Sequence, residues 1–174
     1  MRRPIIAGVD GSEQSLLAVE WAGWEAVRRG APLRIVSAPG LPPRIRTSQA
    51  SSVTVANALR GIAARALAAA VERVAEVVSS PRVDTALLDG PPAQALTECA
   101  ADAQLLVVGA RGVGGFSALV LGSVSRYLAT HAPCPVIVVQ EESTAVHREI
   151  VVGVRDPGDA DAARGPDHDK PFYG

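Results

Sequence analysis

The sequence predicts an α/β fold: an open five-stranded parallel sheet of strand order 3-2-1-4-5, with helices on both faces. Short aliphatic runs alternate with longer segments of helical periodicity, which is the pattern of right-handed strand-helix-strand crossovers. Apolar residues make up 48% of the chain and aromatic residues only 3%, as expected for aliphatic helices packed on a buried sheet. The length of 174 residues suits one such domain with a short appendage.

The first elements are a strand over residues 4–10 and a helix that follows it. The strand PIIAGVD is an apolar run that the residues Asp-Gly-Ser close. Leu16, Val19, Gly23 and Ala26 then share one helical face, and Gly30 is expected to end this helix. A second strand is expected over residues 32–38, followed by a loop rich in Pro and Ser and an Ala-rich helix over residues 55–78.

The remaining elements continue the alternation. We expect a strand over residues 82–90, a helix over 91–102 with prolines in its first turn, a strand over 103–109, a helix over 123–132 and a strand over 135–140. In a sheet of this order the winding reverses between the first and fourth strands, and ligands bind at their carboxyl ends. Asp10 and Gly109 end these strands, so the sequence predicts a ligand site between them.

The chain is expected to divide into a domain over residues 1–142 and a tail over residues 143–174. The segment REIVVGVRDPGDADAA, from Arg148, matches RPIIAGVDGSEQSLLA, from Arg3, in register through the strand. It is interpreted either as the first strand of a truncated second copy or as a chance Val-rich strand. The polar end from about Pro157 is expected to be disordered.

Composition excludes several classes of function. A net charge of −1 offers no electrostatic surface for nucleic acid or an acidic membrane. No segment has the length of a membrane span, and the apolar run in MRRPIIAGVD is too short for a signal peptide. We therefore expect a soluble, cytoplasmic protein. Cys99 and Cys134 lack metal-ligand spacing and are expected to be buried hydrophobic residues, so no metal site is predicted.

The segment GARGVGGFSALVLGSVS, residues 109–125, contains five glycines and three serines. It is either a flexible turn or a cradle in which backbone N–H groups and a helix N-terminus hold phosphate. Its pattern is G-x2-G-x9-G-S; it has neither the P-loop lysine nor the GxGxxG of dinucleotide folds. In the cradle reading, Gly109 and Gly112 let the chain approach a ribose and phosphate. The helix that begins at Gly122-Ser123 offers the amides of Val124 and Ser125 and the hydroxyls of Ser123 and Ser125.

With these motifs the sequence resembles the universal stress protein family, in its nucleotide-binding branch. The resemblance covers roughly residues 3–141 and rests on IIAGVDGSEQS, GPPAQAL, the whole glycine-rich segment and HAPCPVIVV. It implies a flavodoxin-like fold, related to the adenine nucleotide alpha hydrolases, that binds ATP, with or without Mg²⁺. It also implies a homodimer and a role in stress survival.

The resemblance also implies a set of nucleotide-binding residues. Asp10 matches a carboxylate beside the nucleotide, Ala38 a position against the adenine, and Arg111 a residue that can pair with phosphate. The implied set is Gly8, Val9, Asp10, Ala38, Val108, Gly109, Arg111, Gly112, Gly122, Ser123, Val124 and Ser125. Asp10 could instead cap the first helix.

Other polar residues are expected to have structural roles. Ser15 and Ser117 are expected to be surface serines, and Tyr127 and His131 to be packing residues. No arrangement of Ser, His and Asp and no carboxylate pair supports hydrolytic chemistry, so no catalytic residue is predicted.

Three functions follow from these observations. The first is an ATP-binding regulatory protein with little hydrolysis. The second is a slow ATPase or a nucleotidyl-transfer enzyme, which the lack of a lysine or a positioned base disfavours. The third is a nucleotide-free dimerisation module, which the intact glycine pattern disfavours.

A homodimer is expected through the fifth strand. In the predicted strand order the residues VIVV, 136–139, lie at the sheet edge, and an open apolar edge is a template for pairing. The tail segment EIVVGV, residues 149–154, is the alternative cover for this edge.

Overall fold

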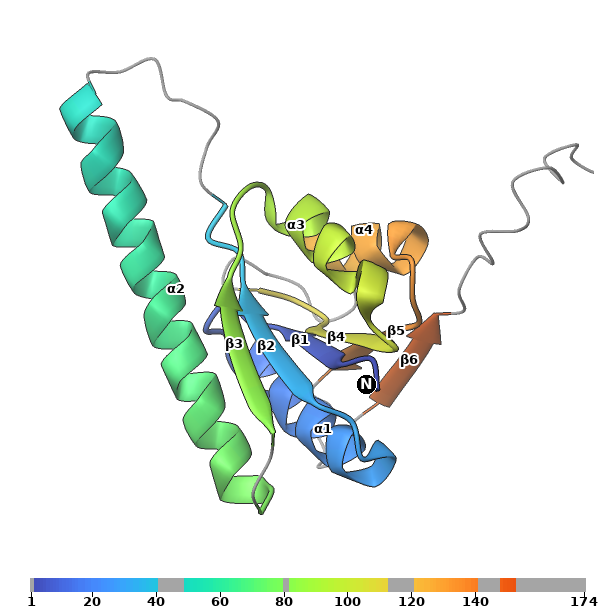
Figure 1. The fold of residues 1–174 in the computed structure, drawn as a ribbon. Helices are drawn as coiled ribbons and strands as arrows, with labels where there is room; N and C mark the ends of the chain where they lie inside the picture. The colour runs from blue at the N-terminus through green and yellow to red at the C-terminus, as the bar shows by residue number, and fades with distance from the viewer. Residues whose placement is uncertain (1, 41–48, 80–81, 113–120, 141–147, 153–174) are drawn as a thin grey trace, which may run out of the picture.

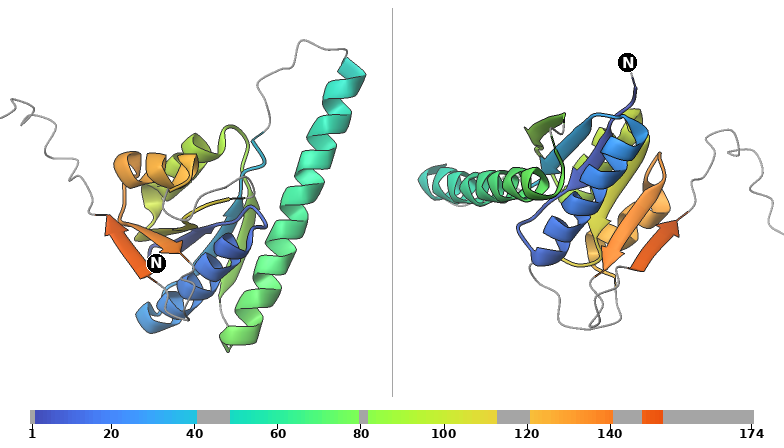
Figure 2. Two further views of the ribbon diagram at one scale, coloured as in Figure 1. Left: turned by 180° about the vertical axis from the view of Figure 1, so that it is seen from behind. Right: turned by 90° about the horizontal axis from the view of Figure 1, so that it is seen from below.

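The computed structural model describes residues 2–40, 49–79, 82–112, 121–140 and 148–152. Within them the strands form one sheet of order β3-β2-β1-β4-β5-β6. Helices α1 and α2 cover one face of the sheet, and α3 and α4 cover the other (Figures 1 and 2). The elements are β1 Ile5–Gly8, α1 Glu13–Arg29, β2 Leu33–Ser37, α2 Gln49–Val77, β3 Val83–Leu87, α3 Pro92–Cys99, a short 3-10 helix η1 Ala100–Asp102, β4 Leu105–Gly109, α4 Ser123–His131, β5 Val136–Gln140 and β6 Arg148–Val152.

The predicted parallel order of the first five strands is confirmed, and a sixth strand adds to it. Strands β1 to β5 pair in parallel, with Gly8 of β1 opposite Val36 of β2 and Val108 of β4. Strand β6 pairs with β5 in the antiparallel direction, with Gln140 opposite Arg148. The edge of β5 that the predicted homodimer requires is therefore occupied by β6 of the same chain. The disorder predicted from Pro157 onward lies outside the described residues.

Helix α1 begins and ends as local chemistry dictates. Ser12 is its N-cap, and the Ser12 side chain accepts a hydrogen bond from the backbone N–H of Ser15 at 3.3 Å. At the other end Gly30 adopts the left-handed conformation, with φ of 60°, and its N–H returns to the carbonyls of Ala26 and Val27. The predicted end at Gly30 is confirmed. Asp10 is not the N-cap, which corrects the alternative role considered for it.

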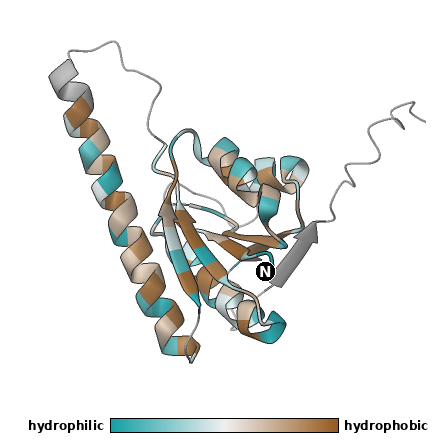
Figure 3. Ribbon diagram, viewed as in Figure 1, coloured by the Kyte–Doolittle hydropathy of each residue, from teal (hydrophilic) through white to brown (hydrophobic). Residues whose placement is uncertain are grey.

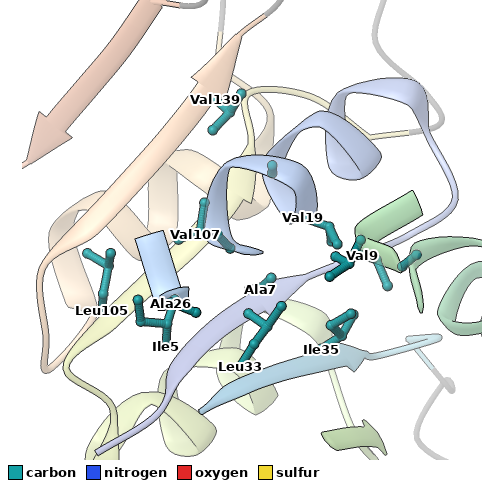
Figure 4. Close-up of a cluster of buried hydrophobic side chains, with 14 of the residues drawn as sticks. Ile5, Ala7, Val9, Val19, Ala26, Leu33, Ile35, Leu105, Val107 and Val139 are labelled. Atoms are coloured by element: carbon teal, nitrogen blue, oxygen red, sulfur yellow. The ribbon is translucent and has the colours of Figure 1, made fainter. Parts of the chain in front are cut away.

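Two apolar cores follow from the alternation of side chains along the strands. Ile5, Ala7 and Val9 point to the face that α1 and α2 cover, where they pack with Leu33, Ile35, Leu105 and Val107 (Figure 4). Ile6 points to the opposite face and packs with Leu96 of α3 and Leu128 of α4. Strands β1, β4 and β5 are almost wholly buried, as expected for the centre of a sheet covered on both faces. Hydrophilic residues interrupt the hydrophobic ones on β2 and β3, toward the sheet edge (Figure 3).

Helix α2 is longer than the sequence predicts. It spans Gln49–Val77, whereas the expected helix covered residues 55–78. The first turn contains Ser51 and Ser52, residue types that compete with the helical backbone for hydrogen bonds and favour loops in a sequence-based reading. The N-terminal half of α2 extends past the sheet (Figure 1), and Val53, Val55 and Ile62 are exposed on it.

Candidate functional site

A cavity of about 370 Å³ opens at the carboxyl ends of β1 and β4. Every site residue predicted from the sequence lines it. Four further lining residues were not predicted: Ser15, Val36, Pro92 and Leu96. Parallel pairing of β1 between β2 and β4 brings the strand ends together, because Gly8 lies level with Val36 and Val108. The cavity therefore lies where the winding of the sheet reverses, as the topology predicts.

One side of the cavity is apolar. Val36 and Ala38 come from the end of β2, Val108 from β4, and Pro92 and Leu96 from α3. Leu96 also packs closely on β1, since a Cβ added at Gly8 would lie 3.2 Å from a Leu96 methyl carbon. This wall has the composition of a site for a flat apolar group such as a nucleobase.

The other side of the cavity carries the N-terminus of α4. Gly122 is the N-cap of this helix and provides no side-chain cap, while its own N–H donates to the Ala110 carbonyl at 2.7 Å. The first N–H groups of a helix have no intrahelical acceptor, and the helix dipole adds partial positive charge there. The backbone N–H groups of Ser123, Val124 and Ser125 at the cavity wall are of the kind that can hold an anion.

The two α4 serines differ in what their hydroxyls contact. The Ser125 hydroxyl is buried and donates to the Ala110 carbonyl at 2.8 Å. It therefore joins the start of α4 to the residue after β4, and the expected contact of this hydroxyl with phosphate stays a prediction. Ser123 is exposed at the cavity. Of the two hydroxyls, that of Ser123 is the more accessible to a phosphate.

The lining contains one acidic and one basic side chain among its described residues, Asp10 and Arg111. The Asp10 carboxylate accepts hydrogen bonds from the Ser12 N–H at 3.0 Å and from the Ser12 hydroxyl at 2.6 Å. Arg111 is half-buried, and the salt bridges among the described residues do not include it. A guanidinium in this position can pair with a phosphate group.

Packing within the protein explains why glycines stand at two positions in the loop. A Cβ at Gly109 would lie 2.8 Å from the carbonyl carbon of Gln14, so α1 itself requires the missing side chain. A Cβ at Gly112 would meet the Asp10 carboxylate, the end of a side chain that can move aside, so packing requires glycine less strictly there than at Gly109. These glycines were expected to admit a ligand, whereas the contacts found in the structure are with α1 and with the β1–α1 turn.

Other predicted roles have mixed outcomes. Ser15 is not a surface serine, because only 3% of it is exposed and its hydroxyl donates to the Ser12 carbonyl. Its position on the helical face of Val19 and Ala22 is the signal that could have shown its burial. Tyr127 and His131 stack on each other, with ring centroids 4.1 Å apart. Ser117 lies outside the described residues.

The two cysteines are free thiols. Cys134 is buried, as expected, and burial raises its pKa to about 11. Cys99 is half-buried, and desolvation also raises the pKa of its thiol. In the described ranges, His, Cys, Asp and Glu side chains nowhere gather in threes as a metal centre would require. None of the described helices is both long enough and apolar enough to cross a membrane.

Comparisons with known proteins give a consistent result. The sequence model of the Universal stress protein family matches residues 1–140. Universal stress protein Rv2624c of Mycobacterium tuberculosis is 33% identical over 140 residues, which are 80% of this chain and 49% of that protein. The chain thus spans about half the length of these curated relatives.

Solved structures resemble the fold over most of the chain. Universal stress protein UspA from Lactobacillus plantarum is 28% identical, with a TM-score of 0.68, and the match covers 79% of this chain and 98% of that one. A universal stress protein in complex with cAMP is 30% identical, with a TM-score of 0.61, and the match covers 79% of this chain and 96% of that one.

Proposed function

Because the chain belongs to the universal stress protein family, we propose that its cavity binds an adenine nucleotide. We further propose that the nucleotide is ATP, that it is hydrolysed little, and that its presence regulates a response to stress. The observation that carries the proposal is the division of one cavity into an apolar wall and an anion-binding wall. The similar protein solved with cAMP supports an adenine-containing ligand.

The adenine is proposed to lie against the apolar wall. Val36, Ala38 and Leu96 offer surface that a nucleobase can cover, and burial of apolar area supplies about 25 cal/mol for each Å² removed from water. The phosphates would then extend toward Arg111 and the first turn of α4. There they meet a guanidinium, a hydroxyl and backbone N–H groups, which are the usual partners of phosphate oxygens.

Slow turnover follows from what these groups can do. Backbone N–H groups and a hydroxyl stabilise the phosphates of the bound ground state, and binding that is equal in ground and transition states does not raise kcat. The described lining contains no lysine or histidine, and its only carboxylate is Asp10. A Mg²⁺ ion carried by the triphosphate would be held mainly by phosphate oxygens and water, with Asp10 as the neighbouring carboxylate.

Self-association is proposed to avoid the edge of β5. Strand β6 already hydrogen-bonds to that edge, so a homodimer through β5 would have to displace it. A cytoplasmic location stays a prediction from the sequence.

The experiment that tests this function has two readouts. Nucleotide-free protein is titrated with ATP, AMP and adenosine in a calorimeter, and phosphate release from ATP is followed separately. We expect ATP to bind and turnover to stay well below roughly 1 per second, the lower end of ordinary enzyme rates. An empty site at saturating nucleotide would favour the dimerisation module, and rapid turnover would favour the ATPase.

A further inference from the structure

A side chain from the first turn of α1 reaches the segment that follows β4. The backbone N–H of Arg111 donates a hydrogen bond to Oε1 of Gln14 at 2.8 Å, across 97 positions of sequence. Gln14 is not among the residues that line the cavity. Its contact is with the backbone that carries two lining residues, Arg111 and Gly112.

Arg111 is the first residue after β4 whose backbone N–H donates to a side chain instead of to strand β5. The N–H of Ala110 still donates to β5, at the Val139 carbonyl, 2.7 Å away. The next N–H, that of Arg111, lies beyond the sheet and donates to Gln14 instead. Because a backbone N–H can only donate, the side-chain oxygen of Gln14 must face it.

A second contact holds the same segment against α1. Gly109 lies so close to the Gln14 backbone that a Cβ there would be 2.8 Å from its carbonyl carbon and 2.9 Å from the Ser15 nitrogen. The nearby Ser12 hydroxyl is a weaker connection, since it is 3.4 Å from the Arg111 carbonyl and 2.6 Å from Asp10. Gln14 therefore supplies the short polar contact between α1 and this segment.

We propose that Gln14 is a positioning residue that holds Arg111 and Gly112 at the phosphate side of the cavity. The inference rests on the proposed function, because it assigns Gln14 a role in holding the phosphate group of an adenine nucleotide. Gln14 acts through the Arg111 backbone and does not touch the ligand. Without the Gln14 oxygen, the Arg111 N–H has lost this acceptor. The backbone from which the Arg111 guanidinium extends is then held less firmly beside the cavity.

The test compares ATP with adenosine, because only ATP uses the phosphate side. Gln14→Met keeps the length of the side chain and removes the acceptor. Gln94→Met, at an exposed position on α3, is the matched control. Affinities for both ligands are measured by calorimetry, and folding is checked by circular dichroism and thermal unfolding.

In Gln14→Met we expect the ratio of ATP affinity to adenosine affinity to fall by roughly five- to tenfold, as the loss of one hydrogen bond in a binding site suggests. Adenosine affinity should change little, and the unfolding midpoint should fall by only a few degrees, as the loss of one part-buried hydrogen bond implies. Gln94→Met should bind both ligands as the parent does. Gln14→Glu retains an acceptor. At high ionic strength, which screens its added charge, it should restore the parental ratio.

Other outcomes separate the possible failures. Equal weakening of ATP and adenosine, or an unchanged ratio in Gln14→Met, would show a structural role only and overturn the inference while leaving the proposed function intact. A parent protein that binds neither ligand would overturn the proposed function and this inference with it.

Discussion

The contacts of individual residues at the cavity distinguish those that can bind a ligand from those that hold the structure together. Ser123 and Ser125 are near neighbours in sequence, yet the first is exposed at the cavity and the second is buried with its hydroxyl bonded to Ala110. A substitution at each position therefore probes a different property. The same reasoning shows that substituting Gly109 would test α1 packing and not ligand binding.

Ser123→Ala is expected to weaken ATP binding roughly tenfold, since it removes one hydrogen bond to a charged group, without changing stability. Ser125→Ala is expected to lower the free energy of unfolding by about 1 kcal/mol, because the Ala110 carbonyl loses a buried donor. Calorimetric titration and denaturant unfolding of both variants check the pair. Interchanged effects would mean that the phosphate lies elsewhere.

The buried thiol of Cys134 predicts a dependence on pH. Burial raises its pKa from 9.0 to about 11, so the folded state holds this proton more tightly than the unfolded state does. Its contribution to stability is full below pH 9 and is lost as the pH rises toward 11. Denaturant unfolding of the parent and of Cys134→Ala should give a difference in unfolding free energy that shrinks over this range. A constant difference would argue against the burial of the thiol.

Among the helices and strands, some boundaries can be predicted from local sequence and others cannot. The strands β1, β2, β4 and β5 are predictable because sheets buried on both faces read as continuous aliphatic runs. The start of α2 was missed, because Ser51 and Ser52 of its first turn favour loops in a sequence-based reading, although Gln49 and Ala50 are good helix formers. The end of α1 at Gly30 is predictable, since glycine adopts the left-handed conformation without strain.

Gly30→Ala is expected to destabilise the protein by about 1 kcal/mol, because its φ of 60° places a Cβ against the following carbonyl oxygen. Gly61→Ala is the matched control within α2, where the added methyl would meet, among the described residues, only the far end of Arg65, at 3.8 Å. It should stabilise by roughly 0.5 to 1 kcal/mol through helix propensity. Equal effects in urea unfolding would contradict the assigned cap.

Part of the candidate site was predictable because a local sequence motif contains its residues. The spacing G-x2-G-x9-G-S and the Asp that ends the first strand identified residues that meet in one cavity. Val36, Pro92 and Leu96 were missed because their place in the wall depends on how β2 and α3 pack, which no local pattern encodes. Gln14 was missed because its hydrogen bond joins segments far apart in the chain.

At the scale of the whole molecule, the sheet edge beyond β5 decides how copies of the chain can meet. Similarity between the tail and the first strand predicts a strand, but it does not give the direction in which that strand pairs. Strand β6 lies antiparallel on β5, so the edge that a dimer would share is covered.

A version of the protein that ends at Glu142 is therefore expected to associate, because it exposes the backbone groups of β5. The full chain is expected not to associate through this edge. Sedimentation of both versions over a range of concentrations makes the comparison. A full chain that dimerises, and a shortened one that does so equally well, would show that β6 is not what controls pairing.

The central claim, that the cavity at the ends of β1 and β4 binds an adenine nucleotide, is tested most directly by mapping backbone amide resonances during an ATP titration. We expect saturable shifts that are largest at Ser123, Val124 and Arg111, with smaller ones at Ala38. These residues belong to separate segments that meet at this cavity. Saturable shifts confined to other surfaces, or none at all at millimolar ATP, would contradict the claim.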